Sequence, residues 1–253
     1  MKALQLTAEG LCLARGQRVL FRDLQVILRS GEMVLMTGPN GSGKSSLLRA
    51  LIGLAPLQAG LLRLSIEGAP SRTISPAGLR GLCLVQGHAP GVKTELTAIE
   101  NLRLCAALDT PVVADEIEAS KAGFDAPRLQ GPEWQTVLDQ ALERVGLARQ
   151  RDIETRRLSQ GQKQRLQLAR FALAAQRAHR PIWLMDEPSA ALDAQGSELL
   201  QALIAEHLSR GGAALVATHL PLSAGDARTR SLRLGDTVPV GRTAARHTDS
   251  WTA

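Results

Sequence analysis

The sequence lacks tyrosine altogether, and its 253 residues include only three phenylalanines and three tryptophans. Cysteine is equally scarce: Cys12, Cys83 and Cys105 are far apart and odd in number, and none forms a C-x-x-C pair. Structural zinc sites usually draw on paired cysteines, and disulfide frameworks on an even set, so neither is indicated. We therefore expect a reducing compartment.

Long apolar runs are also missing. The N-terminal MKALQLTAEG has no apolar segment of the kind found in a signal peptide. No run approaches the ~18 apolar residues of a membrane-spanning helix, and there is no internal repeat. These absences predict a soluble chain with no direct membrane span, so any role at a membrane would depend on a partner.

The charge is moderately basic. Lysine and arginine total 30 against 24 acidic residues, a net charge of +6, and only five of the 30 are lysine. Such a balance suits a nucleotide, a nucleic acid or an anionic membrane face. Because the basic residues are scattered among acidic ones, a solvated surface is the preferred interpretation.

The spacing of apolar residues predicts an α/β fold. Short apolar segments within 2–37, 61–68 and 81–87 indicate strands, and a helical stripe follows Lys44. From 94 to 175 the spacing is helical. Later apolar runs are continuous, as is typical of central parallel strands buried on both faces; they cover 182–186 and 213–219.

We expect a single domain over residues 1–253. Its predicted parts are an α/β catalytic core in two pieces (1–86 and 176–235), a helical subdomain between these pieces (87–175) and a frayed tail (236–253). The mixed, Pro- and Gly-containing segment 109–132 is expected to be a loop or a poorly ordered insertion.

The stretch GPNGSGKSS follows an apolar strand and precedes an amphipathic helix. It fits the pattern G-x-x-x-x-G-K-[ST], whose backbone N–H groups surround a polyphosphate while the helix dipole adds positive potential. A Cβ at Gly41 or Gly43 is expected to block that approach. The candidate ATP-binding residues are Gly38, Pro39, Asn40, Gly41, Ser42, Gly43, Lys44, Ser45 and Ser46.

Lys44 can reach the β- and γ-phosphates, and the Ser45 hydroxyl can ligate Mg²⁺. Farther along, IWLMDE ends a buried strand with Asp186 and Glu187. Adjacent carboxylates repel unless a cation or a proton intervenes. The functional interpretation is a magnesium ion that Asp186 contacts through water, with Glu187 as a base aimed at the attacking water. A solvated strand end before Pro188 is the alternative.

Two further segments could contact phosphate. LSQGQKQR precedes a helix, and Ser159 is either a simple N-cap or part of an anion site for a nucleotide that another subunit holds. The residues of this segment are Leu158, Ser159, Gln160, Gly161 and Gln162. His219, at the end of the apolar run AALVATH, is either an ordinary structural histidine or a γ-phosphate contact.

With these segments in this order, the sequence resembles the nucleotide-binding subunit of ABC transporters over about residues 2–235. The matching motifs are Walker A at 38–45, the signature at 158–162, Walker B at 182–186, the D-loop SAALD at 189–193, which ends on Asp193, and the switch residue His219.

This resemblance implies a P-loop NTPase core of the ABC ATPase type, with a mixed or parallel sheet, an N-terminal antiparallel β portion and an inserted helical subdomain. It also implies a head-to-tail homodimer that hydrolyses ATP with Mg²⁺ as cofactor. ATP would lie between Lys44 of one subunit and Ser159 and Gly161 of the other. Glu187, as the base, and His219 would be catalytic.

A narrower resemblance comes from GHAPGVKTELTAIENL, residues 87–102, with RVLFRDL and GEMVLMTGPNGSGKSSLLRALIGL. These segments are similar to the cytochrome c biogenesis ATP-binding export proteins, the heme exporter ATPases. The similarity implies a peripheral location on the cytoplasmic side of a bacterial inner membrane, with integral membrane subunits of a cytochrome c maturation complex as partners. ATP hydrolysis would power heme export or release of the heme-loaded chaperone.

Three positions depart from the ABC pattern. The Q-loop glutamine, counted back from LTAIENL, falls on His88, with Gln86 two residues earlier. Either could sense Mg²⁺ and the attacking water, and a strand-end turn at Gly87 is the alternative. No aromatic residue lies where adenine usually stacks, so Arg15 is a candidate adenine contact or a plain surface arginine. Gln160 replaces the usual signature glycine, which bears on how closely the backbone can approach the opposing nucleotide.

Other functions remain as alternatives. The same ABC ATPase could serve a different cargo. A regulatory module without turnover is disfavoured by the presence of Glu187 and His219. Nucleic-acid handling would suit the basic charge, but the chain lacks the second ATPase cassette or long coiled coil of DNA- and RNA-associated ABC proteins. We therefore expect no nucleic-acid partner.

Overall fold

The computed structural model of the chain describes residues 2–89, 91–109, 133–177, 180–190 and 192–235. The insertion expected at 109–132 falls, apart from its first residue, outside the described residues. The tail expected at 236–253 lies outside them as well.

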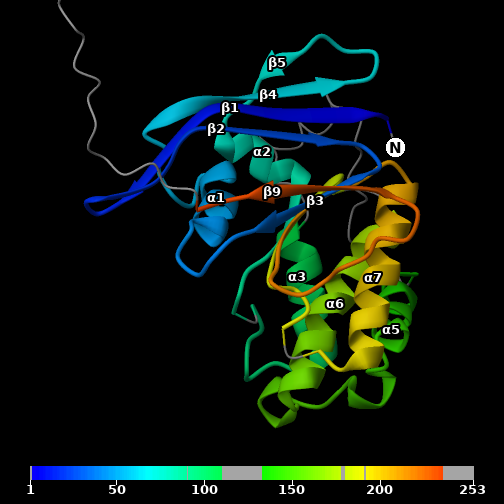
Figure 1. Cartoon of the computed structure of the whole chain (residues 1–253). Helices are drawn as coiled ribbons and strands as arrows, with labels where there is room; N and C mark the ends of the chain where they lie inside the picture. The colour runs from blue at the N-terminus through cyan, green and yellow to red at the C-terminus, as the bar shows by residue number, and fades with distance from the viewer. Residues whose placement is uncertain (1, 90, 110–132, 178–179, 191, 236–253) are drawn as a thin grey trace, which may run out of the picture.

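The described strands form two sheets (Figure 1). The first is antiparallel, in the order β2-β1-β4-β5, and consists of β1 (Leu4–Arg15), β2 (Arg18–Arg29), β4 (Ala59–Ile66) and β5 (Arg72–Thr73). The second is parallel, in the order β6-β7-β8-β3-β9, and consists of β3 (Glu32–Thr37), β6 (Cys83–Gln86), β7 (Ile182–Asp186), β8 (Ala213–Ala217) and β9 (Arg228–Arg233).

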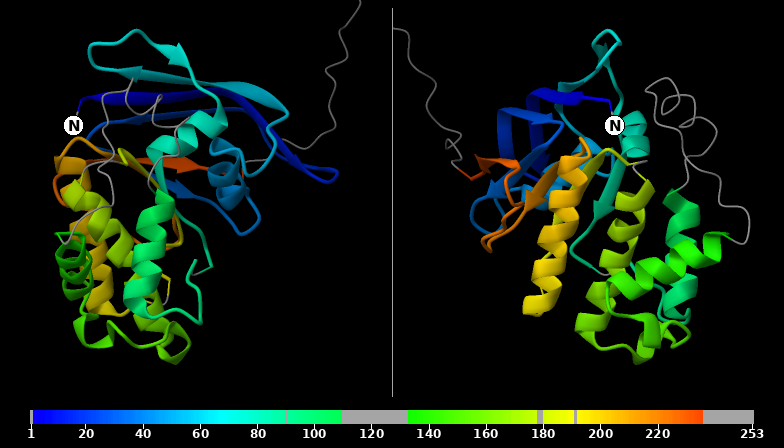
Figure 2. Two further views of the ribbon diagram at one scale, coloured as in Figure 1. Left: turned by 180° about the vertical axis from the view of Figure 1, so that it is seen from behind. Right: turned by 90° about the vertical axis from the view of Figure 1, so that its right-hand side faces the viewer.

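The helices divide into two groups, one beside the antiparallel sheet and one on the far side of the parallel sheet (Figures 1 and 2). The first group is α1 (Lys44–Leu51) and α2 (Pro76–Leu82). The second is α3 (Ala98–Asp109), α5 (Glu133–Arg144), α6 (Gln160–Arg177) and α7 (Ala194–Ser209), with two 3₁₀ turns at Ala148–Gln150 and Thr155–Arg157.

The inner parallel strands β3, β7 and β8 are largely apolar because both of their faces are buried. Along β7, Ile182 and Leu184 pack toward α1 and the antiparallel sheet, whereas Trp183 and Met185 pack toward the second group of helices. Side chains alternate between faces along a strand, so one continuous apolar segment contributes to two cores. This arrangement confirms the predicted α/β fold with its N-terminal antiparallel portion.

Several elements differ from the sequence-based expectation. The strand expected at 81–87 begins only at Cys83, because α2 continues through Leu82 from an N-cap at Ser75, with Pro76 in its first turn. Strand β9 was not expected. Its segment RTRSLR is polar and mostly exposed, as an edge strand can be, so it carries no apolar signal.

Helix α6 continues past the boundary expected at residue 175 and ends at Arg177. A single cluster of buried side chains joins α3, α5 and α6 to β7, β8 and α7. The division into an α/β core and a helical subdomain therefore stays a prediction, since α3, α5, α6 and α7 share one core with the parallel sheet.

His207 on α7 provides a test of this core. Its ring stacks on Trp183 with centroids 3.9 Å apart and an interplanar angle of 7°, and a Cβ on Gly212 would clash with the imidazole. Burial lowers the pKa of His207 from 6.5 to about 4, although backbone hydrogen bonds to Ala213 and Pro181 oppose the shift. The folded state therefore binds this proton less readily than the unfolded state.

We expect the free energy of unfolding to be highest above pH 6.5 and to fall by about 3 kcal/mol as the pH drops from 6.5 to 4, since a lowered histidine pKa favours protonation of the unfolded chain. Chemical denaturation across this range measures it. His207→Gln should remove most of that slope while lowering stability at pH 7.5, and an unchanged slope in the variant would contradict the assignment.

Candidate active site

The site begins at the end of β3, where the chain enters the loop 38–43 and then α1. Gly43 adopts φ 103° as the N-cap of α1, a conformation that L residues rarely adopt. A Cβ there would lie 3.3 Å from Leu20 Cβ and 3.4 Å from Phe21 Cδ1. The expectation that a Cβ at Gly43 blocks the phosphate needs correction, because the Cβ would point at β2 and the glycine is required by φ and packing.

Helix α1 has no side-chain cap at its N-terminus. By contrast, α2 is capped by Ser75 and α7 by Asp193, each accepting a hydrogen bond from a backbone N–H in the first turn. The first N–H groups of a helix lack partners within it. Those of α1 therefore remain available to an anion, and the positive end of the helix dipole reinforces that preference.

Lys44 is almost buried, with 7% of its surface exposed. Its Nζ donates to the carbonyl oxygens of Gly38 at 2.8 Å and Pro39 at 3.2 Å. Nζ also lies 3.2 Å from Nε2 of His219. The ammonium group is thus held inside the loop by neutral acceptors, without a carboxylate to neutralise it among the described residues, which is the state expected of a phosphate-binding lysine.

Glu187 follows β7 in a left-handed backbone conformation, with φ 50°. A non-glycine residue with such a φ carries strain of the kind that concentrates at functional sites. Its backbone N–H donates to the carbonyl of Ala217 at 2.8 Å, which fixes it to the end of β8. The carboxylate accepts the His219 N–H at 3.3 Å, and its other oxygen lies 3.3 Å from His219 Nε2.

Lys44 Nζ and Glu187 Oε1 thus both lie close to the same imidazole nitrogen, Nε2 of His219. Nε2 of His219 cannot accept from Lys44 and donate to Glu187 at the same time, because a neutral ring nitrogen is either an acceptor or a donor. Removal of Lys44 toward a phosphate would therefore leave Nε2 able to donate to Glu187 or to the phosphate.

The residues fit a magnesium ion on chemical grounds. Asp186 is 6% exposed at the end of β7, and no ion pair or hydrogen bond to its carboxylate is present among the described residues. The Oγ of Ser42 is buried without a partner. In the described part of the chain, no group of three or more His, Cys, Asp or Glu residues is arranged so that it could hold a metal ion. Mg²⁺ needs only one or two carboxylates when phosphates and water supply its other ligands.

One cavity of about 670 Å³ collects most of the candidate residues. Its volume is within the range of small-molecule sites. The residues predicted from the sequence that line this cavity are Asn40, Gly41, Ser42, Gly43, Lys44, Ser45, Ser46, Asp186, Glu187, His219, His88 and Arg15. Two residues that sequence reasoning missed, Arg18 and Leu20, also line it, as does Ala190 of the predicted D-loop segment 189–193. Arg18 follows directly after the Gly16-Gln17 turn, which was the available sequence signal.

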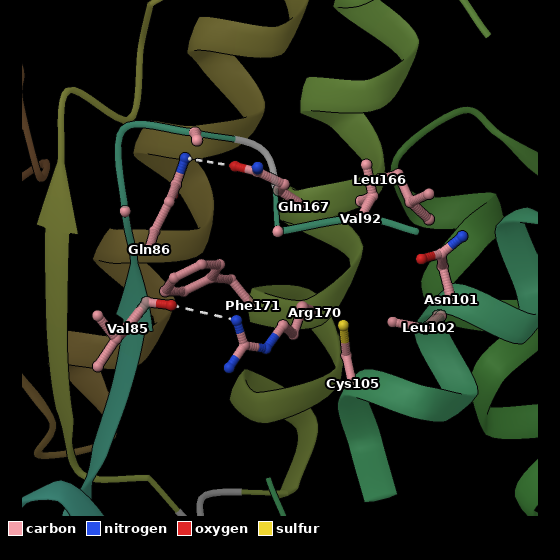
Figure 3. A pocket seen from close by; sticks show the side chains of 13 residues that line it. Val85, Gln86, Val92, Asn101, Leu102, Cys105, Leu166, Gln167, Arg170 and Phe171 are labelled. Carbon is pink, nitrogen blue, oxygen red and sulfur yellow. Dashed lines mark hydrogen bonds between the residues drawn. The ribbon is translucent and has the colours of Figure 1, made fainter. Parts of the chain in front are cut away.

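The two Q-loop candidates separate in space. His88 lines the cavity with Lys44 and Glu187. Gln86, at the end of β6, lies instead in a different pocket between β6, α3 and α6, where its Nε2 donates to Gln167 Oε1 at 3.1 Å (Figure 3). In the same pocket Arg170 donates to the carbonyl of Val85 at 3.1 Å.

The signature segment does not line the cavity of its own chain. Ser159 and Gln162 form a reciprocal capping box at the start of α6, in which Ser159 Oγ accepts from Gln162 N–H at 3.2 Å and Gln162 Oε1 accepts from Ser159 N–H at 2.9 Å. Ser159 is exposed. Its expected role as an N-cap is confirmed, and the capping bonds leave its hydroxyl proton available to an outside acceptor.

Asp193 is likewise occupied within the chain. Its carboxylate accepts the Gly196 N–H at 2.8 Å and pairs with Arg165 at 2.6 Å. The hydrogen bond from the Gly196 N–H is the main reason that the pKa of Asp193 is lowered, and the hydrogen bond from Arg165 is the second. This D-loop residue therefore joins α6 to the start of α7.

Comparison with known proteins identifies similar chains along most of the sequence. The sequence profile described as ABC transporter matches residues 21–190. The cytochrome c biogenesis ATP-binding export protein CcmA of Dechloromonas aromatica is 39% identical over 230 residues, which cover 91% of this chain and all of that protein. The protein of the same name from Rhizobium meliloti is 39% identical over 231 residues, covering 91% of this chain and 98% of that one.

Solved structures agree on the fold. A chain described as the ATP binding subunit of an ABC transporter is 25% identical, with a TM-score of 0.66 and coverage of 85% of this chain and 79% of that chain. A putative ABC transporter ATP-binding protein from Pyrococcus furiosus has a TM-score of 0.64 at 19% identity, covering 91% of this chain and 97% of that one.

Proposed function

Because this chain belongs to the ABC transporter family, as an ATP-hydrolysing subunit, we propose that it powers the export complex of cytochrome c biogenesis. The proposed complex moves heme or releases a heme-loaded chaperone. The observation that supports this choice of cargo is the 39% identity to CcmA of Dechloromonas aromatica across the whole of that protein.

The described contacts support a mechanism for hydrolysis. The free N–H groups of α1 and the Lys44 ammonium bind the β- and γ-phosphates, and Lys44 exchanges its contact with His219 Nε2, at 3.2 Å, for phosphate oxygen. Glu187 accepts a proton from the attacking water. His219, released from Lys44, contacts the γ-phosphate. Positioning and electrostatic stabilisation supply most of the rate enhancement.

Mg²⁺ would be held by the Ser45 hydroxyl and, through water, by the buried Asp186 carboxylate. When bound, the ion neutralises charge that develops on the phosphate oxygens. ABC ATPases generally use Mg-ATP. Of the two Q-loop candidates, we propose His88 for the sensing role, since it lines the cavity with Glu187 whereas Gln86 bonds to Gln167.

Two copies are required in this proposal. Ser159 and Gly161 lie outside the cavity of their own chain, and Ser159 is exposed with a hydroxyl proton to donate. A second copy, bound head to tail, would bring its signature segment over the ATP at Lys44. The pair would bind at the cytoplasmic side of a bacterial inner membrane through integral membrane subunits, a proposal that the similarity to CcmA supports. Among the described residues, no helix is both long and apolar enough to cross a bilayer.

The cargo is tested by purifying the tagged chain from detergent-solubilised membranes and identifying the attached integral subunits. We expect a heme-handling membrane protein, and loss of c-type cytochromes in a deletion strain that the wild-type chain restores and Glu187→Gln does not. An untagged strain controls for carry-over. An amino-acid or metal permease in place of the heme-handling subunit would establish the alternative, an ABC ATPase for another cargo.

A further inference from the structure

The turn between β1 and β2 brings two arginines face to face. Arg15, the last residue of β1, and Arg18, the first of β2, are directly paired across the two strands. Both are exposed, and both line the cavity that contains Lys44. The β1–β2 turn of the antiparallel sheet thus adds two guanidinium groups to the cavity, which residues 40–43 of the loop before α1 also line.

This pair is unfavourable in the chain alone. Like charges directly opposite each other on neighbouring strands destabilise a sheet. Among the described residues, neither Arg15 nor Arg18 has a carboxylate partner, whereas other strand arginines do: Arg63 pairs with Glu9, and Arg230 with Glu32. An anion held between the turn and the loop would remove the repulsion.

Arg18 is positioned to meet such an anion. Its Nη1 lies 3.8 Å from the point that a Cβ on Gly41 would occupy. Gly41 belongs to the loop that is proposed to hold the phosphate chain, so the Arg18 guanidinium lies beside that loop. Arg18 comes from β2, whereas Glu187 and His219, which line the same cavity, follow β7 and β8.

The wall that β1 and β2 contribute offers little with which to read a base. It consists of Arg15, Arg18 and Leu20. No Phe or Trp among the described residues lines the cavity, and none of the three side chains of this wall is an acceptor for the exocyclic amino group of adenine. Guanidinium planes stack on any base, and arginine N–H groups are good donors to O6 and N7 of guanine.

We propose that Arg18 is a second cationic contact for the phosphate chain of the nucleotide, and that this pocket recognises the triphosphate rather than the base. The proposal rests on the proposed nucleotide site and adds its substrate class, nucleoside triphosphates with little preference between adenine and guanine. A site discriminates strongly between such ligands only when buried polar groups are matched to one of them.

The test is equilibrium titration of the full-length chain with Mg-ATP and Mg-GTP. We expect the two dissociation constants of the wild type to agree within about fivefold. Arg18→Gln should weaken the binding of both nucleotides by about tenfold, the usual scale for one charge-assisted contact. Arg18→Lys should retain most of the affinity for both. Arg22→Gln, an exposed β2 arginine outside the cavity, is the matched control and should bind as the wild type does.

Each contrary outcome has a separate meaning. If Arg18→Gln binds as tightly as Arg22→Gln, or weakens only one of the two nucleotides, the phosphate contact is refuted. A preference of the wild type for ATP over GTP of about a hundredfold or more refutes the base-independent recognition. In both cases the ATPase function stands. If the wild type binds neither nucleotide, the proposed site itself is wrong.

Discussion

Glu187→Gln is expected to reduce steady-state ATP hydrolysis by about a thousandfold while leaving the affinity for ATP within a few-fold of the wild type. General-base catalysis contributes on this scale. Glutamine preserves the size of the side chain and its ability to accept the His219 N–H, now at 3.3 Å from the carboxylate, but it cannot take a proton from water. Phosphate release measures the rate, and titration of the purified variant measures the affinity.

The same variant should accumulate as a nucleotide-bound dimer, because closure precedes hydrolysis in the proposed cycle and reopening depends on it. Size-exclusion chromatography with Mg-ATP detects the dimer. Glu198→Gln, an exposed carboxylate on α7 outside the cavity, makes the same chemical change and should leave both rate and oligomeric state unchanged. Normal hydrolysis by Glu187→Gln would show that another group is the base.

Lys44→Ala is expected to weaken ATP binding by about a hundredfold, because the proposed role gives this buried cation contacts to both the β- and the γ-phosphate. In the described structure the Nζ atom is held by the carbonyls of Gly38 and Pro39 at 2.8 and 3.2 Å, which are neutral and can be exchanged for phosphate oxygens at little cost. Isothermal titration with Mg-ATP measures the loss.

The control for this change is Lys2→Ala, which removes an exposed lysine outside the cavity and should bind ATP normally. Thermal unfolding of Lys44→Ala without nucleotide separates a binding defect from a folding defect, and we expect only a small change in the midpoint. Unchanged ATP affinity in a folded Lys44→Ala protein would exclude the phosphate role of this lysine.

The local parts of the site could be predicted because each is encoded in a few consecutive residues. The loop before Lys44 needs a strand, a glycine-bearing turn and an uncapped helix in immediate succession, and these are visible as apolar spacing and composition. The Ser159 cap was also predictable, since a capping box spans four residues. Strand β9 was not, because its edge position requires no apolar face.

By itself, the sequence determined the α/β class, the glycine-bearing loop before Lys44 and the acidic end of β7, since short-range periodicity and backbone requirements specify all three. Tertiary structure alone decided that His88 and not Gln86 joins Lys44 in the cavity, that Glu187 adopts φ 50°, and that Arg18 lies beside Gly41. The physical reason is that parallel strands end at a common edge of the sheet in an order the chain does not follow, so side chains distant in sequence meet there only after the strands have paired.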